Sequence, residues 1–226
     1  ATVAVVAGDW WNIRNVYEPT VNEKKWIEET KKFAQEGDAY AQALLGQLYN
    51  FGRGGLPEDD AEAFKLFEKS ARQGNAEGQY QLGLKYQFKK QATRDDHAAA
   101  LVYYKRAAAQ GHVSATFSVG FLHDQETLLP PSKREAVKWY LKAANMGNIQ
   151  AMFCLALIYS EGGPRELRNI AEGLNWYKKA AELGHADAQF NLGQTYAFAK
   201  GVPRNYAEAI KWYRMAADKN HSEAQF

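Results

Sequence analysis

Hydrophobic and small residues recur at fixed offsets along the chain. Counted from a glycine that closes each unit, they stand four, eight, nine and twelve positions later. After Gly184 these positions hold Ala188, Leu192, Gly193 and Tyr196. Offsets of four place residues on one face of a helix. The pattern predicts one amphipathic helix per unit, called helix A.

Glycine stands at the ninth position in four of five units. A glycine inside a helix costs about 1 kcal/mol relative to alanine. We therefore expect another backbone to approach helix A closely at this position.

A second helix, helix B, is predicted from its start signal. Fifteen positions before each closing residue stands a preferred N-cap residue, and in four of five units a glutamate follows three positions later, as in a capping box. These N-cap residues are Asp59, Asp96, Ser132, Asn169 and Asn205. Each helix B then carries an aromatic-rich pair and ends in a pair of small residues. The closing glycine follows, where a left-handed helix cap is expected.

The closing residues set the period of the chain. They are Gly37, Gly74, Gly111, Gly147 and Gly184, with Asn220 in the sixth place, so the steps are 37, 37, 36, 37 and 36 residues. A fixed period of this size is typical of a solenoid. We predict an all-α, right-handed α/α superhelical solenoid of helix–turn–helix repeats over residues 23–226. It holds about five and a half repeats, the last one truncated.

The two ends of the chain depart from this period. Before Gly37 only a helix B is predicted, over 26–34. Residues 1–22 do not fit the repeat, and we expect them to form an N-terminal capping or extended segment. The chain stops within a new helix A, so the natural protein is expected to continue past Phe226.

Composition narrows the class of protein. Of 226 residues, 46% are hydrophobic and the formal net charge is +2, so no global field favours nucleic acid.

The single cysteine, Cys154, excludes an intramolecular disulfide, and we expect it to be a small buried hydrophobe. No apolar run approaches the 18 residues of a membrane span. The apolar start without methionine favours a processed, periplasmic or otherwise extracytoplasmic protein, with a cytoplasmic location as the alternative.

The repeat resembles the Sel-like repeat (SLR), a relative of the tetratricopeptide repeat. The resemblance covers about residues 24–226 and is clearest in the last full unit, over 188–193, Tyr196, 201–202 and 209–217. It implies a bacterial, exported protein-binding scaffold. Two units lack the family's glycine turn between helices A and B, carrying 89–94 and 127–131 there instead. These loops are candidate specificity elements, or they reflect simple drift.

Catalytic and metal-binding motifs are missing from the sequence. It has no nucleophile elbow, zinc-protease motif or phosphate loop. His112, His185 and His221 stand one position after a closing residue in different units, so we do not expect them to converge on one metal. We predict no cofactor and no enzyme activity, with a hydrolase kept as the alternative of another class.

The opposite face of helix A is the candidate binding surface. In the relatives that the resemblance suggests, this face lines the concave groove. Positions +6, +10 and +14 carry aromatic and aliphatic residues here, and a contiguous apolar band marks an interaction site. For the residues at position +6, packing in the core and contact with a ligand are equally favoured. The side chains at positions +10 and +14 are expected to point away from the core. The candidates are Tyr80, Leu84, Phe88, Phe117, Phe121, Asp124, Phe153, Leu157, Glu161, Phe190, Gln194 and Phe198.

We predict a non-enzymatic scaffold that binds a partner protein or peptide in this groove, acts as a monomer and does not bind nucleic acid. One narrower alternative is an immunity protein that neutralises a type VI secreted antibacterial effector, such as a phospholipase. An adaptor in envelope assembly or host interaction is another.

Overall fold

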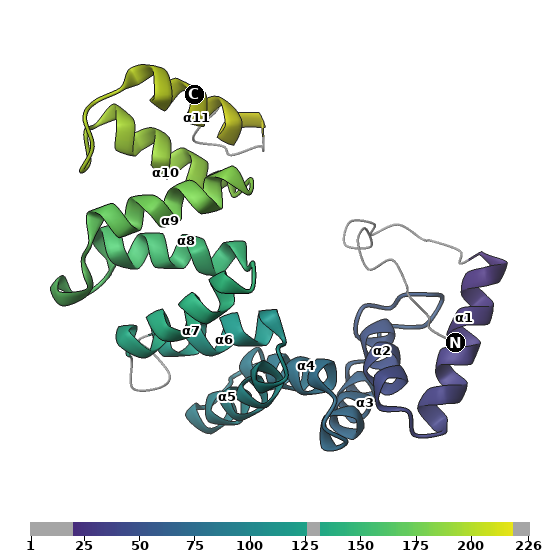
Figure 1. Cartoon of the computed structure of the whole chain (residues 1–226). Coiled ribbons are helices and arrows are strands. Elements are labelled where there is room, and N and C mark those ends of the chain that lie inside the picture. The colour runs from purple at the N-terminus through teal and green to yellow at the C-terminus, as the bar shows by residue number, and fades with distance from the viewer. Residues whose placement is uncertain (1–19, 126–131, 219–226) are drawn as a thin grey trace.

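The computed structural model describes residues 20–125 and 132–218, without the side chains of residues 161 and 162 (Figure 1). This part of the chain contains helices and no strand. The α-helices are α1 (Val21–Gln35), α2 (Ala39–Asn50), α3 (Asp60–Arg72), α4 (Ala76–Gln87), α5 (Arg94–Ala109), α6 (Val113–Asp124), α7 (Lys133–Asn145), α8 (Ile149–Leu157), α9 (Ile170–Glu182), α10 (Ala186–Ala197) and α11 (Tyr206–Asp218). A π-helical turn (Ile158–Gly162) and a short 3₁₀ helix (Arg165–Leu167) follow α8.

The helices stack in chain order. Each packs against the helix before it and the helix after it, and α2 also contacts α4. The chain thereby forms a curved array in which α2, α4 and α6 lie nearer the inner side than α3, α5 and α7 (Figure 1). The predicted all-α solenoid of helical hairpins is confirmed. Helix A corresponds to the even-numbered helices and helix B to the odd-numbered ones.

The predicted N-terminal helix B is α1, which begins at Val21. Thr20 caps it, and the Thr20 and Glu23 side chains bond reciprocally to each other's backbone N–H groups. Residues 1–19, which make up most of the predicted capping segment, lie outside the described part of the chain.

Each junction between units uses the closing glycine in the predicted left-handed conformation. At the α7–α8 junction, Gly147 has φ 88°. The next residue, Asn148, donates its N–H to the Ala143 carbonyl (3.0 Å), and its side chain accepts from the Ala151 N–H (2.7 Å). One residue thus closes one helix and caps the next, so a two-residue connection satisfies the backbone.

The predicted helix-B starts are correct in four units and wrong in one. The N-cap side chain accepts the backbone N–H three residues on at Asp59, Ser132, Asn169 and Asn205. The reciprocal glutamate bond of a capping box is absent at Asp59, Ser132 and Asn169. In α5 the N-cap is Thr93, and Asp96 is the third helical residue. The Asp96 carboxylate accepts the Thr93 N–H (2.9 Å). The cap lies three residues before Asp96 because Thr93 and Asp96 together form a capping box.

The nearest neighbour of the glycine at the ninth position is an aromatic ring rather than the expected backbone, although at Gly120 the Ala136 carbonyl oxygen would also lie 3.3 Å from an added Cβ. A Cβ on Gly83 would lie 2.5 Å from the Tyr104 ring, and one on Gly120 would lie 2.7 Å from the Tyr140 ring. Both tyrosines are fully buried. The missing side chain lets a helix-B ring lie flat against helix A.

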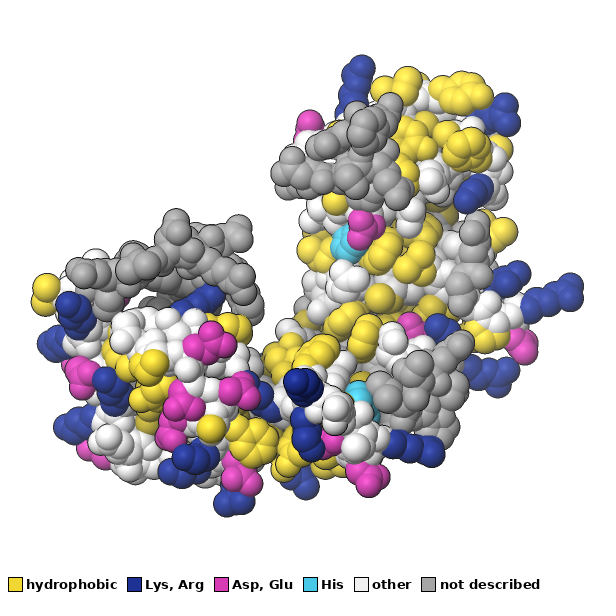
Figure 2. All heavy atoms as spheres, turned by 180° about the vertical axis from the view of Figure 1, so that it is seen from behind, with side chains coloured by type: hydrophobic (Ala, Val, Ile, Leu, Met, Phe, Trp, Pro, Cys, Tyr) yellow, Lys and Arg dark blue, Asp and Glu magenta, His cyan; other side chains and the backbone are white. Residues whose placement is uncertain are grey.

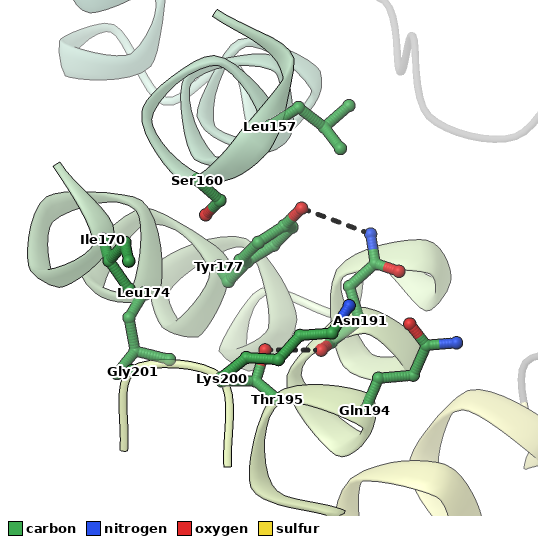
Figure 3. A pocket seen from close by; sticks show the side chains of 10 residues that line it. All are labelled: Leu157, Ser160, Ile170, Leu174, Tyr177, Asn191, Gln194, Thr195, Lys200 and Gly201. Atoms are coloured by element: carbon green, nitrogen blue, oxygen red, sulfur yellow. Dashed lines mark hydrogen bonds between the residues drawn. The ribbon is translucent and has the colours of Figure 1, made fainter. Parts of the chain in front are cut away.

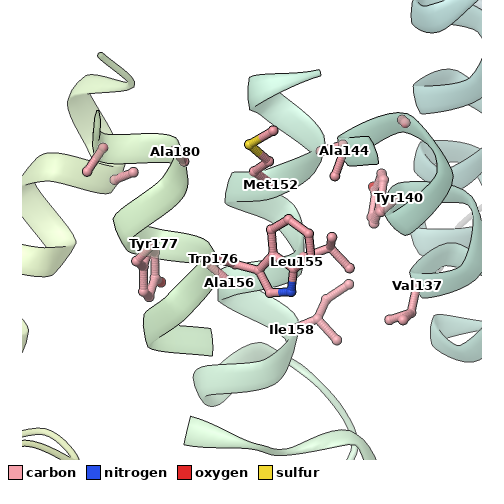
Figure 4. Close-up of a cluster of buried hydrophobic side chains, with 14 of the residues drawn as sticks. Val137, Tyr140, Ala144, Met152, Leu155, Ala156, Ile158, Trp176, Tyr177 and Ala180 are labelled. Carbon is pink, nitrogen blue, oxygen red and sulfur yellow. The ribbon is translucent and has the colours of Figure 1, made fainter. Parts of the chain in front are cut away.

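The largest core cluster lies in the C-terminal half and joins successive units (Figure 4). Leu155 and Ala156 of α8 meet Trp176 and Tyr177 of α9, and the cluster extends to Trp212 of α11. Smaller clusters hold the N-terminal units together. The solenoid therefore has a continuous series of interfaces between neighbouring units.

Buried glutamines tie three of the units to the preceding helix B, a feature that the sequence patterns did not reveal. The Gln189 side chain donates to the Ala181 carbonyl (2.9 Å), and the Gln42 side chain donates to the Ala34 carbonyl (3.1 Å). Gln79 makes the same bond to the Ala71 carbonyl (3.5 Å). Each of these carbonyls also accepts the N–H of the closing glycine, so the glutamine adds a second hydrogen bond at the helix end.

Candidate partner-binding surface

The aromatic residues at position +6 are half-buried and serve packing on one side. Phe117 contacts the ring of Tyr140 at 5.5 Å between centroids, and Phe153 contacts the ring of Tyr177 at 6.1 Å. Tyr80 and Phe190 make the same contact with the helix-B tyrosine of their own unit. These four candidates therefore form the floor of the candidate binding face of the A helices.

His112 and His185 are structural caps. The Nδ1 atom of His112 accepts the backbone N–H of Ala115 (3.1 Å), and the Nδ1 atom of His185 accepts the backbone N–H of Ala188 (3.3 Å). The ring of His185 also stacks on Phe153, 4.4 Å between centroids. Nδ1 is thus occupied by capping, and His221 lies outside the described residues.

The Nε2 of His112 contacts the Glu77 carboxylate of the preceding unit at 3.0 Å. Burial acts to raise the pKa of Glu77, but hydrogen bonds from His112, Gln81 and Gln47 outweigh it and hold that pKa below its usual value. Glu77 is therefore an ionised link between units.

Position +10 divides into packed and exposed residues. Leu84 and Phe121 are half-buried, and Phe121 contacts Phe117 (6.2 Å between centroids) and the core cluster. The expectation that Phe121 points away from the core is wrong, because the two rings pack along one helix face. Leu157 is 39% exposed, and Gln194 lines a hollow described below.

The most exposed candidates stand at position +14. Phe88 is 73% exposed and Phe198 is 65% exposed, and they are the C-cap residues of α4 and α10. Phe51, the C-cap of α2, is also exposed. Three phenylalanines thus stand at the same end of three different A helices.

The two acidic candidates differ from these rings. Asp124 forms an ion pair with Lys133 of α7 (2.6 Å), and the Tyr140 hydroxyl donates to it (3.4 Å). Asp124 is therefore engaged within its own unit. The side chain of Glu161 lies outside the described part of the structure.

Figure 2 shows how hydrophobic and charged side chains are distributed over one face of the molecule. Hydrophobic side chains gather on the arm that holds the C-terminal helices, and charged side chains stand mainly at the margins (Figure 2). The molecule is hollowed between its two arms (Figure 2). The hydrophobic side chains on this face of the molecule are thus concentrated on one of the two arms.

A distinct hollow of about 430 Å³ lies between α8, α9 and α10 (Figure 3). Its walls include the candidates Leu157 and Gln194. The sequence analysis missed its other residues, which are Ser160, Ile170, Leu174, Tyr177, Asn191, Thr195, Lys200 and Gly201. They come from three helices and one loop, so no single sequence pattern connects them.

Cys154 is partly buried beside Tyr140 of the preceding unit, and burial raises the pKa of its thiol to about 11. At neutral pH the thiol is protonated, which agrees with a packing role.

Within residues 20–125 and 132–218, no group of three or more His, Cys, Asp or Glu residues is placed to hold a metal ion. None of the helices described here is long and apolar enough to cross a membrane. Of the two unusual loops, 127–131 lies outside the described residues, and Lys89 in the other is paired with Asp96 at 2.9 Å.

Comparison with solved structures gives several relatives. A protective antigen, c5321, from uropathogenic Escherichia coli, which displays an SLR fold, is 32% identical with a TM-score of 0.79 over 90% of this chain. This chain spans only 43% of that antigen. A Sel1 repeat protein from Oxalobacter formigenes is 27% identical (TM-score 0.74), with 91% of this chain and 86% of that one covered.

A more distant structure is the immunity protein PA5088 from Pseudomonas aeruginosa. It is 19% identical with a TM-score of 0.56, and 87% of this chain and 73% of that one are covered. At this identity the likeness concerns the fold alone. No curated protein matches the chain.

The family model of the Sel1 repeat matches five consecutive segments, 39–75, 76–112, 113–148, 149–185 and 186–221. The first four segments each begin with a helix A and end at the junction residue that caps the next helix A. These segments cover most of the chain, which therefore belongs to the Sel1 repeat family.

Proposed function

We propose that this protein is a scaffold whose inner face binds an extended segment of a partner protein. The Sel1 repeat fold favours a protein-interaction scaffold, and proteins of this kind are generally non-enzymatic. The observation that carries the proposal is the row of exposed apolar side chains on the A helices: Phe51, Phe88, Leu157 and Phe198. Phe51, Phe88 and Phe198 stand at position +14 of three units, and Leu157 stands at position +10 of a fourth, so they can contact successive apolar residues of a bound extended chain.

Such a row of exposed apolar side chains is unusual on a surface that binds no other molecule. Exposed apolar side chains scattered singly are normal, but an aligned set marks an interaction site. The half-buried rings Tyr80, Phe117, Phe153 and Phe190 underlie the same surface, so the exposed residues stand on a rigid, packed floor. A preorganised surface loses less entropy on binding.

The proposal is tested with peptides selected from a random library on the immobilised chain and then titrated in solution. Replacing Leu157→Ala together with Phe198→Ala should weaken their binding about tenfold to a thousandfold, because each truncated anchor costs roughly 1–2 kcal/mol or more. Both side chains are exposed, so circular dichroism should be unchanged.

The matched control lies on α7, where Lys138 and Lys142 are exposed. Lys138→Ala with Lys142→Ala should leave affinity nearly unchanged. If this lysine pair abolishes binding and the apolar pair does not, the partner binds the other side of the solenoid. If no peptide is selected at all, the proposal of an extended segment is wrong.

The immunity role stays a prediction, since the similar immunity proteins are 19% identical and support the fold alone. A gene for a secreted toxin next to this one would favour it. The extracytoplasmic location, the monomeric state and the lack of nucleic-acid binding are likewise predictions, as is the absence of hydrolase activity. Mass spectrometry of the native N-terminus tests the first of these.

A further inference from the structure

Two of the five A helices begin with a histidine, whereas the other three begin with an aspartate or an asparagine. His112 caps α6 and His185 caps α10. Each ring accepts the backbone N–H three residues on through Nδ1. Asparagine and aspartate side chains remain acceptors at neutral and mildly acidic pH, but a histidine nitrogen accepts only while the ring is neutral. These two caps can therefore be lost in the pH range in which histidine titrates.

The contacts of His185 fix the position of its ring proton. Because Nδ1 accepts from the Ala188 N–H (3.3 Å), the proton is on Nε2, which lies 2.9 Å from the Gln150 side-chain oxygen. Protonation of Nδ1 would set an N–H group against the Ala188 N–H. It would also place a positive charge at the N-terminus of α10, where the helix dipole disfavours it. The charged ring therefore cannot make the cap that the neutral ring makes.

The two histidine caps differ in the group that faces Nε2. His112 contacts the Glu77 carboxylate at 3.0 Å, so a protonated His112 ring would have an ionic partner in place of its cap. His185 faces the amide of Gln150, which is neutral. Acid should therefore affect the start of α10 more than the start of α6.

The surroundings of His185 give the direction of this effect. Burial lowers the pKa of the ring below its usual value, and it outweighs Asp187 on α10, which acts in the opposite direction. Among the described residues, no charged side chain of α8 or α9 acts on the ring. The unfolded pKa is about 6.5, so unfolding takes up a proton just below that pH. The cap's contribution to stability is complete above about pH 6.5 and is lost as the pH falls below it.

We propose that His185 is an acid-sensitive cap, which releases the start of α10 in mild acid and thereby weakens the binding face on the C-terminal arm. α10 carries Gln194 of that face and ends at Phe198. The ring of His185 also stacks on Phe153, which belongs to the floor of the face (4.4 Å between centroids). The effect on binding rests on the proposed function, whereas the release of α10 does not. The partner segment would be held at neutral pH and bound more weakly in an acidic environment.

Amide hydrogen exchange of the free chain tests the cap without any partner. Exchange is followed by mass spectrometry at about pH 7.5 and about pH 5, with rates corrected for the intrinsic effect of pH. Protection of α10 should fall about fivefold in acid, which is the size expected for the loss of one N-cap. His185→Asn should remove this fall, because Asn148 caps α8 in the same way (2.7 Å). The matched control is His112→Asn, which should leave the acid response of α10 unchanged.

A second variant checks the role of the group on Nε2. Gln150→Glu gives His185 the kind of partner that Glu77 gives His112, so it should reduce the acid response of α10. The inference is overturned if α10 keeps its protection in acid. It is also overturned if His185→Asn loses as much protection as the native chain.

Binding is then measured with peptides selected at neutral pH that carry no titratable side chains. Their affinity for the native chain should fall about fivefold at about pH 5 and stay nearly constant for His185→Asn. An unchanged affinity of the native chain would overturn the link between the cap and the binding face. If no peptide is selected at neutral pH, the proposed function fails, and the exchange measurement still decides whether the cap is acid-sensitive.

Discussion

Single residues set how closely neighbouring helices approach, and exchanges between facing positions keep the packing constant. Ser70 stands where four other units have alanine at the end of helix B, and the residue it faces is Gly78. A Cβ on Gly78 would lie 2.3 Å from the Ser70 hydroxyl oxygen. Interiors are close-packed, so a larger residue on one helix requires a smaller one on its neighbour.

Replacing Gly120→Ala should destabilise the protein by about 1–3 kcal/mol, since the new methyl group overlaps the buried Tyr140 ring and overpacks the core. Urea denaturation followed by circular dichroism measures this. In the Tyr140→Leu background the alanine should cost less, because the flat ring is gone. An unchanged midpoint for Gly120→Ala would contradict the contact between ring and glycine.

At the scale of elements, the junctions decide where each helix ends and the next begins. The residue after each closing glycine caps the following helix A; these residues are Asp38, Asn75, His112, Asn148 and His185. All five carry a side-chain acceptor for the backbone N–H three residues on. The period of the chain therefore follows from local hydrogen bonding.

The start of α5 should respond to acid. The backbone N–H of Thr93 and the Lys89 ammonium hold the pKa of Asp96 at about 2. The unfolded value is about 3.9, so ionised Asp96 stabilises the fold above about pH 4, and this contribution is lost as the pH falls toward 2. The stability difference between the native chain and Asp96→Asn should therefore shrink over that range. An NMR titration of the Asp96 carboxyl near 3.9 would contradict this.

At the scale of the whole molecule, stability is distributed over neighbouring interfaces because each helix contacts mainly the helices adjacent to it. Trp212 of α11 is buried in the C-terminal core cluster, and Ile27 of α1 is buried in the N-terminal one. Loss of either should act locally in such an array.

Trp212→Ala should cost about 3–5 kcal/mol and speed amide hydrogen exchange in α10 and α11 while leaving α2–α4 unchanged. Ile27→Ala should have the reverse distribution, with faster exchange in α1 and α2. Hydrogen exchange with mass spectrometry resolves the two patterns. A uniform rise along the chain in both variants would show that the array unfolds as one unit instead.

The binding surface was predictable only in part. Helical periodicity placed Phe88 and Phe198 on the face away from the core, and both are exposed. The same periodicity could not separate Phe121, which is half-buried, from Leu157, which is exposed, because both stand at position +10. Exposure there depends on the neighbouring rings. Tyr177, Asn191 and Lys200 were missed because they meet only when α9, α10 and the following loop pack together.

By itself the sequence determined the helices, their order, the left-handed closing glycines and the membership in a repeat family. These features depend on hydrogen bonds within a few residues and on a period along one dimension. The tertiary structure decided what fills the space at each glycine and which side chains at position +10 are exposed. Those outcomes depend on contacts between side chains that are distant in sequence.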